Sequence, residues 1–250
     1  MNRFTRIAAL TLVATPFFAA RADLVFGGIV TVGGTGLGTV NTVLTIQSQA
    51  NNTSEQGCVT PTSNGSSFAT GNLVVNACVP GANPDVLTGA SQTQTRNVGA
   101  TGVTTAQNFA ILFNASEPAG NSISLNNLVA YFMNSSGATF QANLNCPAPT
   151  CNFASTQTGT GNSGFLFQLN AAEATSFATF IASSGGINNV WVGLGALAGA
   201  TPGFEATGGL ETFFVFNSGQ ATVIPEPSSI VLVATGMIGL VAGVRRRRAR

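Results

Sequence analysis

The chain contains no histidine and no lysine, and charged residues make up only 7% of its 250 positions. Histidine or lysine usually supplies the base in nucleophilic triads, so their absence excludes the commonest hydrolytic machinery. Between the arginines at the two ends, eight acidic residues stand against one basic residue, Arg96. The chain therefore lacks the basic patch that binds phosphate groups, and we expect no nucleic-acid partner.

Metal and cofactor motifs are equally scarce. No D-x-D-x-D-G loop is present, which excludes an EF-hand and leaves open only an irregular Ca²⁺ site. The segment GLGALA, residues 193–198, fits G-x-G-x-x-A, but Pro202 forbids the long helix that a dinucleotide site needs after it. We therefore predict a non-enzymatic protein without a cofactor, in which no residue is catalytic and none binds a metal.

The first 22 residues have the pattern of a secretory signal peptide. A basic start precedes an apolar run over residues 7–20, and Ala20-Arg21-Ala22 matches an A-x-A cleavage site before Asp23. The alternative is an amphipathic first helix of the fold, which Pro16 disfavours. The pattern predicts an exported protein.

At the other end, residues 230–244 carry no charge and precede Arg245, Arg246, Arg247 and Arg248. Fifteen helical residues reach ~22 Å, which is short for a hydrocarbon layer of ~30 Å but feasible with local thinning. We predict a transmembrane helix over about 229–244 and a basic stop-transfer tail over 245–250 that stays in the cytoplasm. A core helix with a solvated basic tail is the alternative.

Pro225-Glu226-Pro227, Ser228-Ser229, the glycine-bearing apolar run and the arginine block together resemble a PEP-CTERM sorting signal. The resemblance implies an exosortase-type processing enzyme as partner, with Pro225, Glu226 and Pro227 as its recognition element. It also implies a precursor held transiently in the inner membrane, a mature form outside the cell or on its surface, and an association with exopolysaccharide and biofilm. Which bond is cleaved stays open.

The middle of the chain, residues 23–222, alternates Val-, Ile-, Phe- and Thr-rich runs with Gly, Asn, Ser and Pro clusters. This pattern predicts a single all-β domain of the β-sandwich or jelly-roll type, followed by a sorting segment over 223–250. In 122–133 the apolar alternation changes phase at Asn126-Asn127, which predicts a bulge. The expected strands are 24–32, 39–47, 72–78, 107–113, 122–133, 139–144, 164–169, 189–195 and 211–217.

One short helix interrupts the strands. Asn170 and Glu173 form a capping box, Phe177 and Phe180 share a face with Ile181, and Gly185 can end the helix. We expect this helix to cover one edge or end of the sandwich.

The four cysteines, Cys58, Cys78, Cys146 and Cys151, are expected to form disulfides in an exported chain. Three pairings are possible, and the local one, Cys58 with Cys78 and Cys146 with Cys151, is favoured. A zinc site is the alternative, but no histidine is present and C-x4-C is not the usual knuckle spacing.

The leading functional hypothesis is an exported surface or extracellular-matrix protein with a structural or adhesive role. A carbohydrate-binding module is the second hypothesis, although Trp191 and Tyr131 both lie in apolar runs that favour the core. The third is a two-carboxylate glycoside hydrolase that would use Glu173, Glu205 and Glu211.

Overall fold

The computed structural model describes residues 23–32, 41–48, 52–65, 67–89, 91–115, 122–144, 151–154, 163–207 and 209–223. The predicted signal peptide and transmembrane helix lie outside these residues. Within them, the secondary structure is mainly β-strand with one α-helix, which confirms the prediction of an all-β fold with one short helix.

The strands form two sheets whose pairings are all antiparallel. In the six-stranded sheet the spatial order is β14 (Ala221–Val223), β1 (Leu24–Val32), β11 (Ser163–Leu169), β7 (Phe109–Asn114), β13 (Glu211–Asn217) and β2 (Asn41–Ile46). In the eight-stranded sheet it is β10 (Asn152–Ala154), β8 (Ser122–Asn134), β12 (Val190–Ala198), β3 (Glu55–Thr62), β4 (Ser67–Val74) and β5 (Ala77–Pro80), with β9 (Thr139–Asn143) beside β8 and β6 (Arg96–Asn97) beside β12.

The sequence prediction places one strand over 72–78, and this prediction is wrong. The chain turns at Val75 and Asn76, so the segment is divided between β4 and β5. Strands β3, β6, β10 and β14 were not predicted.

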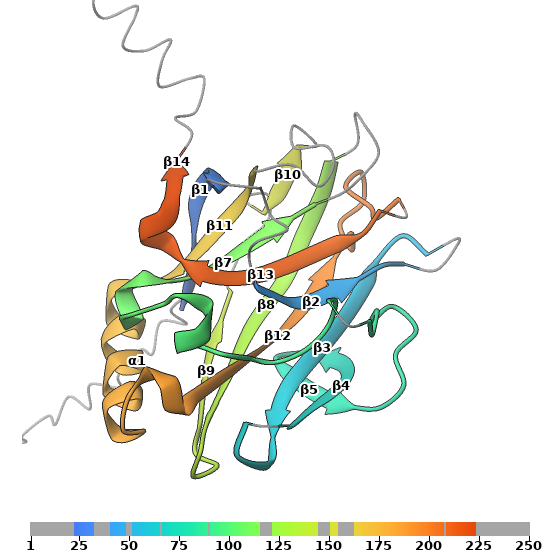
Figure 1. Ribbon diagram of the computed structural model, residues 1–250. Helices are drawn as coiled ribbons and strands as arrows, with labels where there is room; N and C mark the ends of the chain where they lie inside the picture. Colours follow the sequence, from blue (N-terminus) through green and yellow to red (C-terminus); the bar gives the residue numbers. More distant parts are fainter. Residues whose placement is uncertain are drawn as a thin grey trace, which may run out of the picture.

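The two sheets face each other across one core that is rich in phenylalanine (Figure 1). Phe109 of β7 and Phe132 of β8 contact each other across the two sheets with their ring centroids 5.1 Å apart. Along β7 and β13, Phe113 and Phe213 are stacked at 4.8 Å. Aromatic pairs in these geometries stabilise a core beyond the apolar area that they bury.

The helix α1 (Ala171–Ser183) begins and ends as the sequence predicts. The Asn170 side chain accepts a hydrogen bond from the Glu173 backbone N–H at 2.8 Å. At the other end, the Gly185 and Gly186 N–H groups donate to the carbonyls of Ala182 and Ile181, which is a Schellman motif. Figure 1 shows α1 at one end of the sheets, away from β4 and β5.

The predicted bulge in β8 is also confirmed. Leu197 of β12 lies opposite Asn127 and Ala198 lies opposite Leu125, so Asn126 is the extra residue. Its side chain accepts from the Ala200 N–H at 2.9 Å and donates to the Thr201 hydroxyl at 2.8 Å. The bulge therefore fixes the loop that follows β12.

Phe177 is fully buried, and its ring lies 4.2 Å from Phe132 and 5.7 Å from Phe109 between centroids. We expect Phe177→Ala to lower the free energy of unfolding by about 3–5 kcal/mol, because it leaves a cavity under α1. Urea denaturation of residues 23–223 measures this, with Thr179→Ala on the exposed face of α1 as the control. A loss below about 1 kcal/mol would show that α1 does not close this end of the core.

Candidate functional site

Strands β3, β4 and β5 fold back over the outer face of the eight-stranded sheet. A Cβ atom at Gly193 of β12 would lie 2.1 Å from the Val59 carbonyl oxygen, so the β3 backbone rests directly on β12. A Cβ atom at Gly71 of β4 would lie 2.0 Å from the Val79 carbonyl oxygen of β5. The first glycine of GLGALA, Gly193, thus allows two strands to pack closely, and the whole segment is part of β12.

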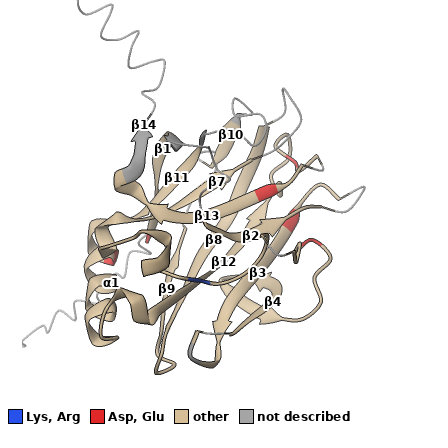
Figure 2. Ribbon diagram, viewed as in Figure 1, with Lys and Arg blue, Asp and Glu red and all other residues tan. Residues whose placement is uncertain are grey.

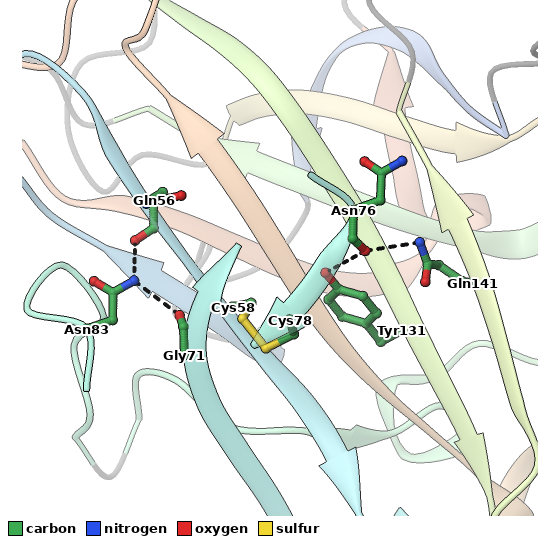
Figure 3. Close-up of a disulfide and its surroundings, with 8 residues drawn as sticks. All are labelled: Gln56, Cys58, Gly71, Asn76, Cys78, Asn83, Tyr131 and Gln141. Carbon is green, nitrogen blue, oxygen red and sulfur yellow. Dashed lines mark hydrogen bonds between the residues drawn. A yellow bond between two sulfur atoms is a disulfide. The ribbon is translucent and has the colours of Figure 1, made fainter. Parts of the chain in front are cut away.

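The tip of the β4–β5 hairpin reaches as far as β8 and β9 (Figure 3). The Asn127 amide donates to the Val75 carbonyl at 2.6 Å. The Asn76 carbonyl accepts two hydrogen bonds, from the Tyr131 hydroxyl and the Gln141 amide, both at 3.1 Å. Three side chains from two strands therefore hold the hairpin against the sheet.

The disulfide Cys58–Cys78 joins β5 of this hairpin to β3, as the predicted local pairing requires (Figure 3). Cys58, Leu73, Val129 and Tyr131 form a small apolar cluster below it. Cys151 is also disulfide-bonded, and Cys146 lies outside the described residues.

A pocket of about 390 Å³ opens beside the hairpin. Its lining comes from β3, β5, β8 and β9 and comprises Thr60, Ala77, Cys78, Tyr131, Phe132, Met133, Thr139, Phe140 and Gln141. None of these side chains carries a charge at neutral pH. Burial raises the pKa of the Tyr131 hydroxyl above its usual range, so this group stays protonated. The pocket combines aromatic rings with neutral hydroxyl and amide groups, a surface suited to an uncharged ligand with hydroxyl groups.

The sequence does not reveal this pocket, because its walls come from strands that meet only through the fold. Tyr131 is 8% exposed, in agreement with its expected place in the core. Trp191 is half-buried, and a Cβ atom at Gly65 would lie 2.3 Å from its indole ring. These two residues therefore do not form an open aromatic platform.

The carboxylates considered for hydrolysis are not gathered in one cleft. Glu211, at the start of β13, is 0% exposed, so a substrate cannot reach it. Burial raises the pKa of Glu173, which lies in the first turn of α1. In α1, Phe177 contacts Phe109, and Phe109 pairs with the last residue of β13. The helix therefore lies at the end of β13 that is far from Glu211. Glu173 and Glu211 therefore lie toward opposite ends of β13, whose seven residues span ~20 Å, whereas the two carboxyl groups of a catalytic pair lie ~5–9.5 Å apart. Glu205 lies half-buried in the loop between β12 and β13.

Charges are sparse over the described part of the chain (Figure 2). Arg96 is its one basic residue, and burial lowers the pKa of this guanidinium. Among the described residues, no group of three or more cysteine, aspartate or glutamate side chains is placed to hold a metal ion. No helix among them has the length and apolarity needed to cross a membrane.

Pro225, Glu226 and Pro227 and the block from Arg245 to Arg248 lie outside the described residues. The family model for the PEP-CTERM protein-sorting motif matches residues 223–248. This match confirms the resemblance found in the sequence. No curated protein and no solved structure matches the chain.

The Cys58–Cys78 disulfide closes a loop with a sequence separation of 20 residues. Replacing both cysteines by serine should lower the free energy of unfolding by about 3 kcal/mol, because the unfolded chain regains the entropy of that loop. Urea denaturation measures the change, with Ser67→Ala at the exposed start of β4 as the control. Unchanged stability in the double variant would contradict a bracing role for this bridge.

Proposed function

We propose that this chain, which carries a PEP-CTERM sorting motif, is an exported surface or extracellular-matrix protein with a structural or adhesive role. The motif at residues 223–248 carries the proposal, because it implies processing by an exosortase-type enzyme and transit through the membrane. The precursor is held in the inner membrane by its C-terminal segment until it is processed. The Cys58–Cys78 disulfide supports export, since such bonds persist in oxidising compartments.

The adhesive role is supported by the outer surface of the β4–β5 hairpin. Four large apolar side chains there, Phe68, Val74, Val75 and Val79, are between 47% and 80% exposed. Val75 has a φ of 56°, which is rare for a β-branched residue, and Asn127 holds its carbonyl in place. Exposed apolar groups and retained backbone strain both occur at contact surfaces.

Carbohydrate binding is the second candidate, and the uncharged pocket beside this hairpin is the observation that favours it. Its volume of about 390 Å³ is in the range of small-molecule sites. The hydroxyls of Thr60 and Thr139 and the amide oxygen of Gln141 match sugar hydroxyls, and the half-buried Phe140 supplies ring carbons for the apolar face of a sugar. A neutral polysaccharide fits this lining better than an acidic one, which would need a cationic partner.

Replacing Pro225-Glu226-Pro227 by three alanines should leave the precursor in the membrane fraction, because the processing enzyme loses its recognition element. Immunoblots of fractionated producing cells measure the ratio of precursor to mature protein. Replacing Pro147 and Pro149 of the Cys146–Cys151 segment by alanine is the matched control, since it removes a second Pro-x-Pro and leaves the motif intact. Normal processing of the triple-alanine variant would refute the proposed sorting.

Replacing Thr139 by arginine should fill the pocket with a long side chain and place a positive charge there, and no lining residue carries the negative charge to pair with it. We expect Thr139→Arg to weaken the binding of neutral cello-, malto- or xylo-oligosaccharides at least tenfold, measured by isothermal titration calorimetry. Thr175→Arg, on the exposed face of α1, is the matched control and should bind as the wild type does. Absence of binding by the wild type, or equal binding by Thr139→Arg, would contradict carbohydrate recognition at this pocket.

A further inference from the structure

The sorting motif begins where the folded domain ends. Its first matched residue, Val223, is also the last residue of β14. Pro225 follows two residues later, and two extended residues span at most ~7 Å. The recognition element is therefore tethered directly at the edge of the six-stranded sheet.

This edge is held by a short pairing. β14 is the terminal strand of the sheet, and three residue pairs join it to β1: Val30 with Val223, Thr31 with Thr222 and Val32 with Ala221. Figure 1 shows β14 at one side of the sheet, next to β1. Short edge strands belong to the low-stability end of local unfolding, because few contacts and few backbone hydrogen bonds are lost when they open.

While β14 stays paired, at most ~7 Å of extended chain separates the folded sheet from Pro225, which leaves a processing enzyme little extended chain to bind on the domain side of the motif. Opening β14 frees three more residues and adds ~10 Å of reach before Pro225. We propose that β14 must detach from β1 for the PEP motif to be processed, so that this strand controls the rate of release. The inference rests on the proposed sorting function and adds a regulatory element to it.

The test locks β14 in place in the full-length precursor. Thr31 and Thr222 lie opposite each other, so Thr31→Cys together with Thr222→Cys brings two cysteines within disulfide range. We expect the disulfide-bonded precursor to be processed at least tenfold more slowly in pulse-chase immunoblots. Inserting eight Gly/Ser residues between Val223 and Ile224 of the locked precursor should restore the rate to within twofold of wild type, because the motif then extends without opening β14.

The chain offers a matched control for the lock. Thr45 of β2 and Thr212 of β13 are also cross-strand partners in the same sheet, at a site away from β14. Thr45→Cys with Thr212→Cys should leave the processing rate unchanged. Mass spectrometry of each precursor establishes that the engineered disulfide has formed.

The outcomes separate this inference from the proposed function. A wild-type rate in the Thr31/Thr222 lock overturns the inference alone, and so does a slow lock that the eight-residue insertion fails to restore. Equal slowing by the Thr45/Thr212 lock also overturns it, because the effect would then not be specific to β14. If replacing Pro225-Glu226-Pro227 by alanines leaves processing unchanged in the same assay, the proposed function fails and this inference fails with it.

Discussion

The arrangement of the outer face depends on the direct contact between the backbones of β3 and β12. Any side chain at Gly193 would collide with the Val59 carbonyl, so β3 can cross the face of β12 only because this position is glycine. That crossing carries β4 and β5 over the sheet and brings Cys78 to Cys58. The disulfide, the pocket and the exposed hairpin are therefore consequences of one close approach, and they would be lost together if β3 stayed flat at the sheet edge.

Side-chain amides replace charges in stabilising the loops and strand ends. Asn134 accepts hydrogen bonds from the backbone N–H groups of Ser136 and Ala138. Asn83 donates to the carbonyls of Gln56 and Gly71 and so connects β3 to β4 (Figure 3). An amide provides both a donor and an acceptor and has no charge to desolvate, so it satisfies buried backbone groups at lower cost than an ion does. This explains how a domain with so few charged residues retains well-defined loops.

Local patterns in the sequence predict the helix and most of the longer strands well, but they predict the outer layer and the two- and three-residue strands poorly. The phase change at Asn126 locates the bulge, because period-two alternation is a local property. Strand β3 is missed because Gly57 and Pro61 interrupt a run with little apolar alternation. The turn inside 72–78 is missed because Val75 adopts a conformation that its own chemistry disfavours, and contacts from β8 hold it there. The pocket depends on those contacts, so no local pattern predicts it.

The two ends of the domain are attached to the sheets in different ways. At its start, the Asp23 N–H donates to the Asn143 carbonyl at 3.0 Å and the Asp23 carbonyl accepts from Asn170 at 2.9 Å. Leu24 also bridges to Leu144, so both sheets hold this end. At the other end, the backbone pairing that the structure describes on the outer edge of β1 is the three-residue one with β14. Since opening follows the weaker attachment, the C-terminal edge can open while the core and the N-terminal attachment stay intact. A domain built in this way can expose its sorting segment without unfolding.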